Sequence, residues 1–132
     1  MVVLKFGGTS VADREAIRRL VDIVAAAGLR PIVVVSALGG ATDRLLALAA
    51  HAAAGDAAGA DKALVELRER HLEVAGVITD PVIHGDVSAA LHTEFAELER
   101  VVSALGVLRD TSPKWMDAVA AVGELCSSRI VA

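Results

Sequence analysis

The sequence has very few aromatic residues and a single cysteine. Phenylalanine and tryptophan together make up 2% of 132 residues, tyrosine is absent, and Cys126 is the one cysteine. With few rings to stack on bases and a formal net charge of −4, the chain lacks the features of a nucleic-acid-binding protein. One cysteine excludes an internal disulfide framework, and the four histidines lack the spacing of zinc ligands.

Long apolar runs and a targeting segment are also missing. The N-terminus, MVVLKFGG, has no basic region followed by a long apolar stretch, so it is not typical of a signal peptide. No run approaches the roughly 20 apolar residues of a membrane span. Hydrophobic residues are 55% of the chain, which is enough for a packed core. We therefore expect a cytoplasmic protein without a membrane partner.

Two short aliphatic runs flank an amphipathic segment near the start of the chain. VVLKF (2–6) and IVVV (32–35) are β-branched and apolar, which is typical of strands covered on both faces. Apolar residues between 17 and 24 repeat at helical spacing, and Gly28 stands where a helix C-terminal cap belongs. This order predicts a βαβ unit with parallel strands.

The remainder of the chain is dominated by helical patterns. Amphipathic stretches predict helices over 42–55, up to about 74 after a small-residue loop, over 86–106, and from 112 to the end. The last of these is expected to be interrupted near Gly123. Two strands are too few for a closed sheet, and the apolar pattern runs to the last residue without a cap. We therefore expect part of a larger α/β domain.

The stretch KFGGTS places a lysine and two glycines between the first strand and the following helix. Gly7 and Gly8 let the backbone approach an anion closely, and the helix start adds partial positive charge. Lys5 adds a full charge at the carboxyl end of the strand, where α/β sheets bind ligands. The pattern matches neither GxGxxG nor GxxxxGK[ST]. From spacing alone, a phosphate-binding loop and a tight turn with a solvated lysine both remain open.

A second small-residue loop, SALGGATD (36–43), follows the second strand. Two parallel strands that each end in a glycine-rich helix start would bring two anion-binding loops together, as a polyphosphate and an acidic substrate require. The alternative is structural: Ser36 ends the strand, and Thr42 is the helix N-cap. Ser10 and Asp13 could contact a ligand, but helix capping is the simpler explanation of both residues.

Three motifs together carry a family resemblance. KFGGTSV (5–11), VVSALGGATD (34–43) and VGELCSS (122–128) resemble, in order and approximate spacing, the aspartate kinases of the amino-acid kinase family. The resemblance implies a partial three-layer αβα fold of the carbamate-kinase-like type, with a parallel sheet. It implies that residues 1–132 are the N-terminal, amino-acid-binding lobe of the kinase domain. The nucleotide-binding half and the ACT regulatory domains of the family are absent from this sequence.

The resemblance also implies a reaction. This is the ATP-dependent phosphorylation of the β-carboxylate of L-aspartate to 4-phospho-L-aspartate, the first step of lysine, threonine and methionine biosynthesis, with Mg²⁺ carried by the nucleotide. Matched by position, the catalytic residue is Lys5. The nucleotide phosphates are contacted by Lys5, Gly7, Gly8, Thr9 and Ser10. The aspartate is contacted by Ser36, Thr42 and Glu124, of which the last holds the ammonium group. No protein ligand to a metal is implied.

The residue types suit this chemistry. A carboxylate acceptor is already ionised at neutral pH, so no general base has to remove a proton. Lys5 and the loop amides would neutralise the charge of two approaching anions. Glu124 would select an α-amino acid through a charge-assisted hydrogen bond. Without the resemblance, Glu124 is better explained as an acid near a helix N-terminus, favourable to the dipole.

Two other hypotheses remain at this point. In the first, the chain is a non-catalytic binding or assembly module derived from the same lobe. In the second, it is part of a related kinase that acts on another carboxylate. A bifunctional aspartate kinase begins in the same way. We expect a homo-oligomer, and no kinase activity from this chain alone, because the later half of the family fold is missing.

Four further residues are expected to have structural roles. Cys126 is expected in the core and His84 in a loop without a metal. Glu66 is expected to pair with Arg70 at helical i, i+4 spacing.

Overall fold

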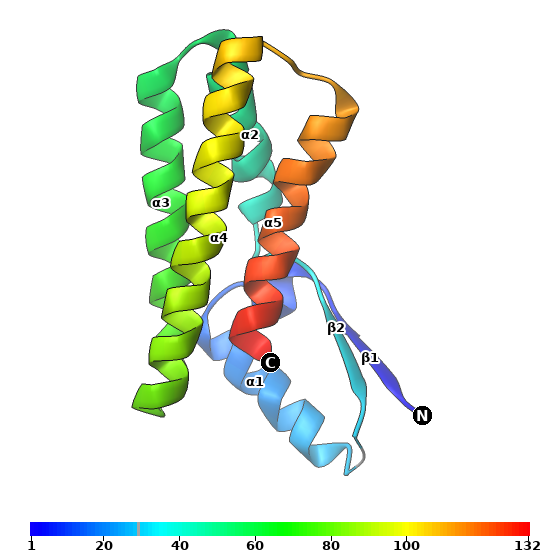
Figure 1. Cartoon of the computed structure of the whole chain (residues 1–132). Helices are drawn as coiled ribbons and strands as arrows, with labels where there is room; N and C mark the ends of the chain where they lie inside the picture. Colours follow the sequence, from blue (N-terminus) through cyan, green and yellow to red (C-terminus); the bar gives the residue numbers. More distant parts are fainter. Residues whose placement is uncertain (29) are drawn as a thin grey trace.

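A small parallel sheet is joined to a bundle of long helices. The computed structural model describes residues 1–28 and 30–132. The elements are, in chain order, β1 (Val3–Phe6), the 3-10 turn η1 (Gly8–Val11), α1 (Arg14–Ala26), β2 (Ile32–Val35), α2 (Ala41–Ala54), α3 (Ala57–Ala75), α4 (Pro81–Leu108) and α5 (Pro113–Val131). Figure 1 shows α2 to α5 running alongside one another, with α1 and both strands at the lower end. No helix in the described ranges combines the length and apolar character needed to cross a bilayer.

The strands pair in parallel, as the βαβ pattern predicts. Lys5 is in register with Val34, and the Ser36 amide continues the ladder by donating to Phe6 O at 3.0 Å. Both strands therefore end side by side, and Figure 1 shows these ends directed toward the start of α2. This confirms the α/β class and the parallel sheet.

The described residues cover only one face of the sheet. Because successive side chains of a strand alternate between faces, each strand has an inner and an outer set. The inner set, which packs against the helices, consists of Leu4, Phe6, Val33 and Val35. On the outer face, Val3, Ile32 and Val34 are 57%, 49% and 44% exposed. The prediction of strands covered on both faces is therefore wrong for the described chain, which forms two of the three layers that the resemblance implies.

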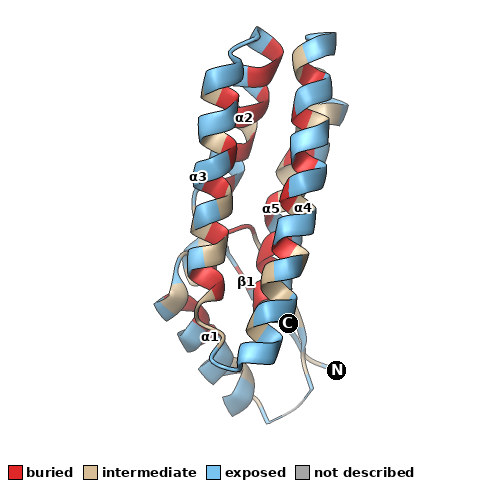
Figure 2. Ribbon diagram, turned by 60° about the vertical axis from the view of Figure 1, so that its left-hand side comes forward, coloured by how far each residue is buried: buried red, intermediate tan, exposed pale blue. Residues whose placement is uncertain are grey.

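The core runs along the facing sides of the helices. Figure 2 shows buried residues in stripes that face one another across the bundle, with exposed residues on the outside. Leu48 of α2, Leu67 of α3 and Leu98 of α4 are each at most 1% exposed. Each leucine buried in this way contributes roughly 1.5–3 kcal/mol relative to an exposed one. The bundle thus supplies most of the packed core next to which the loops at the sheet end lie.

Helix α3 begins earlier than predicted. The small-residue stretch after Gly55 is helical from Ala57, because the Asp56 carboxylate accepts a hydrogen bond from the Gly59 amide at 2.9 Å. An aspartate that accepts this bond satisfies one of the amides that every helix start leaves without a partner. The predicted loop is therefore replaced by the first turns of a helix.

Helix α4 is longer than predicted at both ends. Asp80 accepts hydrogen bonds from the amides at 82 and 83, and Pro81 occupies the first helical position. His84 therefore lies in a helix, and the prediction of a loop is wrong. At the other end the helix passes through Gly106 and stops where Arg109 adopts a left-handed conformation, with φ of 54°.

Helix α5 is continuous through Gly123, in contrast to the predicted interruption. A Cβ at this position would lie 2.9 Å from Ala37 Cβ and 2.9 Å from Leu45 Cδ1. Because Gly123 has no side chain, α5 can pack closely against α2 and against the loop after β2. In this helix the tertiary contact outweighs the poor helix propensity of glycine.

One histidine is buried inside the bundle. His71 is 1% exposed, and its Nδ1 donates to Leu67 O at 2.7 Å. Its ring and that of Phe95 pack in a T-shaped arrangement, with a centroid distance of 5.3 Å. Its Nε2 has no hydrogen-bond partner in the described chain. Burial lowers the pKa of His71 below its usual 6.5, the Leu67 carbonyl opposes this shift, and the charge of Arg70 adds to it.

The buried His71 makes stability depend on pH. The folded-state pKa is lowered, so the unfolded chain binds a proton more readily below pH 6.5. The stability that neutral His71 contributes is complete above that pH and is lost as the pH falls through the folded-state pKa. We therefore expect urea denaturation to show a free energy of unfolding that falls more steeply with acidification in the parent than in His71→Leu. Carboxylates titrate in both proteins, so parallel curves from about pH 7.5 to pH 5 would contradict the prediction.

Candidate functional site

The first glycine loop forms a tight turn directly after β1. Gly7 has an extended backbone, and its carbonyl accepts a hydrogen bond from the Ser10 amide at 2.9 Å, which closes η1. Asp13 then caps α1, because its carboxylate accepts from the Ala16 amide at 2.8 Å. The capping role expected of Asp13 is confirmed.

The second loop makes a similar turn after β2. The Ala41 amide donates to Leu38 O at 2.8 Å, and Gly40 adopts φ of 74° as the N-cap of α2. A left-handed backbone of this kind is readily adopted only by glycine. Thr42 lies inside the first turn of α2, with an exposed side chain, so the prediction that it is the N-cap is wrong.

The two loops touch through their glycines. A Cβ on Gly39 would lie 3.1 Å from Ala12 Cβ and 3.2 Å from Gly8 O. A Cβ on Gly8 would lie 3.5 Å from Ala37 O and 3.7 Å from the Gly39 Cα. Backbone therefore lies against backbone here, with the small methyl group of Ala12 beside the contact. This close approach explains a glycine at 39 and brings the predicted phosphate and substrate loops together.

Helix α5 is attached to the second loop next to the predicted acid. Ser127 is buried, and its Oγ lies 2.6 Å from Ser36 O and 3.0 Å from Glu124 O. A hydroxyl has one proton, and the shorter distance favours donation to Ser36 O. Glu124 lies one turn before Ser127 and is exposed, well inside α5. The alternative that placed this acid near a helix N-terminus is therefore wrong.

The remaining predicted residues lie around these loops. Lys5 is exposed at the end of β1, on the outer face of the sheet beside Val34. Thr9 and Ser10 line a small cavity of about 210 Å³ between the first loop and α1. Arg19 of α1 also lines this cavity. The structure thus brings the two loops and α5 together, and the ligand contacts of the individual residues stay predictions.

The contact of Arg70 with the two loops could not be predicted from the sequence. Its spacing predicts a pair with Glu66, which instead lies 3.9 Å from Lys62. The Arg70 guanidinium donates to Gly39 O at 2.5 Å and to Ala12 O at 3.3 Å. These acceptors are backbone carbonyls 31 and 58 positions away, so no local pattern identifies them.

Cys126 is a core residue and not a reactive thiol. It is completely buried, and burial followed by the nearby charge of Glu94 raises the pKa of its thiol to about 12, with Arg129 acting in the opposite direction. A thiol with such a pKa is almost entirely protonated at neutral pH, and the thiolate is the reactive form. The expectation of a core role for Cys126 is confirmed.

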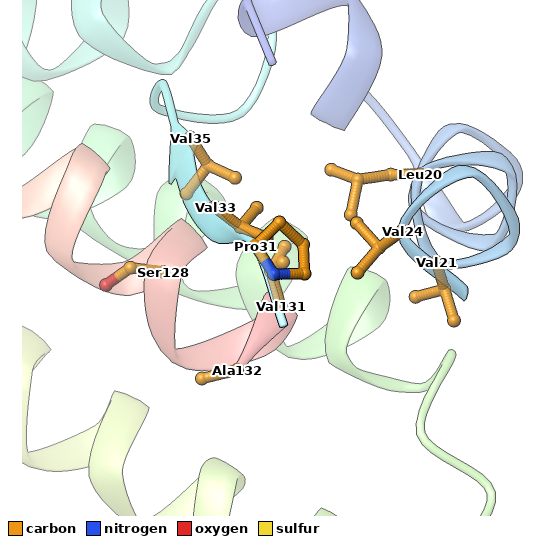
Figure 3. Close-up of a pocket in the computed structure, with 9 residues that line it drawn as sticks. All are labelled: Leu20, Val21, Val24, Pro31, Val33, Val35, Ser128, Val131 and Ala132. Carbon is orange, nitrogen blue, oxygen red and sulfur yellow. The ribbon is translucent and has the colours of Figure 1, made fainter. Parts of the chain in front are cut away.

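A larger cavity, of about 440 Å³, lies away from the glycine loops. Figure 3 shows Leu20 and Val24 of α1 projecting toward β2, where Val33 and Val35 lie on the inner face of the sheet. Ser128 and the end of α5 complete the wall. An almost wholly aliphatic lining offers nothing to neutralise a phosphate, so the cavity does not suit a nucleotide.

The fold and the loops define a class of protein. It is an α/β domain in which glycine-rich loops follow adjacent parallel strands at their carboxyl ends, the position where such sheets bind ligands. A model of the amino acid kinase family matches residues 1–132. The chain belongs to this family.

The relatives within the family are aspartokinases. The aspartokinase of Schizosaccharomyces pombe is 36% identical over 141 residues, which span 99% of this chain and 27% of that protein. Lysine-sensitive aspartokinase 3 of Escherichia coli is 34% identical over 133 residues, or 97% of this chain and 27% of that protein. The crystal structure of E. coli aspartokinase III with aspartate and ADP has a TM-score of 0.77 at 32% identity, and the match covers 99% of this chain and 28% of that one. The chain therefore spans about a quarter of the length of these relatives.

The hydrogen bond between Ser127 and Ser36 O should stabilise the junction of β2 and α5. Ser127→Ala leaves a carbonyl without its partner, and we expect the free energy of unfolding to fall by about 1–3 kcal/mol in urea denaturation. The matched control is Ser128→Ala, because the exposed Ser128 donates only to Leu125 O within its own helix. An equal loss in both variants would show that the bond to the loop adds nothing.

Proposed function

We propose that the protein carrying this chain is an aspartate kinase, which transfers the γ-phosphoryl group of ATP to the β-carboxylate of L-aspartate. The observation that carries the proposal is the contact between two glycine loops at the ends of adjacent parallel strands, with α5 bonded to the second loop. The aspartokinase relatives support it, and E. coli aspartokinase III crystallises in complex with aspartate and ADP together. The product, 4-phospho-L-aspartate, leads to lysine, threonine and methionine.

The first loop binds the nucleotide phosphates in this proposal. Lys5 neutralises charge on the transferring group, and the amides of Gly7 and Gly8 donate to phosphate oxygens. The hydroxyls of Thr9 and Ser10 add further donors. Mg²⁺ arrives with ATP as part of the substrate. Within the described ranges, no three His, Cys, Asp or Glu side chains gather into a metal site.

The second loop and α5 bind aspartate. Ser36 and Thr42 contact the substrate, and Glu124 accepts a charge-assisted hydrogen bond from its ammonium group. A β-carboxylate oxygen attacks the γ-phosphorus while the bond from that phosphorus to the ADP oxygen breaks. The attacking carboxylate is already ionised, so the protein contributes position and charge neutralisation and needs no general base.

The chain forms one side of this site. Since it spans about a quarter of its relatives, we infer that the rest of the polypeptide supplies the adenine pocket and the group that grips the β-carboxylate. The chain alone then has no kinase activity. A homo-oligomer and a cytoplasmic location also remain proposals, and two relatives, both from Arabidopsis thaliana, are named as chloroplastic.

Replacing Lys5 tests the phosphoryl-transfer role. In the protein that carries this chain, we expect Lys5→Ala to lower kcat for aspartyl phosphate formation by about 100- to 1,000-fold, since a preorganised charge at the reacting group is lost. The exposed side chain makes the change harmless to the fold. Lys62→Ala, an exposed lysine of α3, is the control. Activity near that of the parent would refute the role of Lys5, and a parent that phosphorylates glutamate but not aspartate would point to another carboxylate.

Replacing Glu124 tests recognition of the ammonium group. A hydrogen bond to a charged group is worth about 1.5–3 kcal/mol, so Glu124→Ala should raise KM for aspartate by about 10- to 100-fold. KM for ATP should change little, because the acid faces the amino acid in this proposal. Glu69→Ala, an exposed glutamate of α3, serves as the control. Steady-state kinetics that show an effect on ATP alone would contradict the assignment.

A further inference from the structure

Arg70 is hydrogen-bonded to the backbone at both loops. A single Nη2 atom lies 2.5 Å from Gly39 O and 3.3 Å from Ala12 O. Gly39 belongs to the second loop, and Ala12 directly follows η1 and precedes the Asp13 cap of α1. One guanidinium on α3 therefore bridges the two segments that meet at the sheet end.

The guanidinium occupies an electrostatically unfavourable place. Partial burial lowers the pKa of Arg70 below its usual range, and the like charge of Arg44 on α2 lowers it further, while Glu73 acts in the opposite direction. A cation that loses water is costly unless its N–H groups find acceptors. The carbonyls of Gly39 and Ala12 are those acceptors, and their hydrogen bonds with Arg70 connect α3 to both loops.

The same bonds orient the peptide groups. In a planar trans peptide, the C=O of one residue and the N–H of the next point in opposite directions. Gly39 O faces Arg70, so the Gly40 amide faces away from α3. This peptide unit lies inside the turn that the Ala41 amide closes on Leu38 O, and Arg70 bonds to its carbonyl from outside the loop. Removing Arg70 would leave the turn closed but take away the bond that fixes its position relative to α3.

We propose that Arg70 is a positioning residue of the phosphoryl-transfer site, which sets the two glycine loops relative to one another without touching either substrate. This inference rests on the proposed function of the loops. Each loop keeps its own closing bond, from the Ser10 amide in one and the Ala41 amide in the other. The loss of Arg70 therefore displaces the loops and does not unfold them. A displacement of about 1 Å between reacting groups can lower a rate by roughly 100-fold.

Arg70→Met removes the donors and keeps most of the aliphatic stem. In the protein that carries this chain, we expect kcat to fall by about 10- to 100-fold, with KM for aspartate and for ATP changing less than about threefold. Arg14→Met is the matched control. Arg14 also joins two helices, since its Nε lies 2.6 Å from Glu73 O and 3.0 Å from Glu73 Oε1 on α3. Arg14→Met should lose similar stability and keep its kcat.

Hydrogen exchange measured by mass spectrometry supplies a readout that needs no activity. Peptides covering 7–13 and 36–44 should exchange faster in Arg70→Met than in the parent or in Arg14→Met. If Arg70→Met does not fold, Arg70→Gln is judged on the same two measurements.

Four results would overturn the role of Arg70. They are an unchanged kcat in the folded variant, an equal kcat loss in Arg14→Met, an effect confined to KM, and unchanged exchange in both loops. The failure of the proposed function is recognised separately. If the parent phosphorylates no aspartate, the aspartate kinase proposal is refuted. If the loops nevertheless exchange faster in Arg70→Met, the result still supports the role of Arg70 in positioning them.

Discussion

The contact between Gly8 and Gly39 is the constraint around which this end of the molecule is arranged. The two turns after the parallel strands lie backbone against backbone, and a Cβ on Gly39 would meet Gly8 O at the tight distance of 3.2 Å. Strand pairing brings the loops to one edge, and Arg70 and Ser127 then hold them from α3 and α5. Backbone amides of both loops are thereby gathered in one region, which is what a reaction between two anions requires.

Much of this arrangement could be predicted from short-range patterns. The βαβ unit follows from two aliphatic runs around an amphipathic segment, and Asp13 and Pro113 mark helix starts by their own local chemistry. The loops are recognisable because Gly7 and Gly8, and later Gly39 and Gly40, stand directly after strands. Each of these patterns lies within a few residues of the structure that it predicts, so it can be recognised without knowing the tertiary fold.

The starts of α3 and α4 are set by local caps at Asp56 and Asp80 that the prediction overlooks, but the other failures arise because partners distant in sequence decide the outcome. Gly106 and Gly123 suggest helix ends, yet α4 and α5 continue through both, and Gly123 packs against Leu45 of α2. Arg70 has the spacing for a pair with Glu66, but two carbonyls from other segments are its acceptors. The strands have the aliphatic pattern of a sheet covered on both faces, whereas the outer face is exposed in the described chain, which spans about a quarter of its relatives.

The exposure of Lys5 and Glu124 limits the strength of their charges in the proposed site. Both side chains stand in water, where two unit charges 4 Å apart attract by only about 1 kcal/mol, against roughly 4 kcal/mol at the lower effective dielectric of a partly covered site. The described helices and strands leave both charges in water, so they do not provide the lower dielectric that would strengthen them. A second wall over the outer face of the sheet would both exclude water and strengthen Lys5 without changing any residue of this chain.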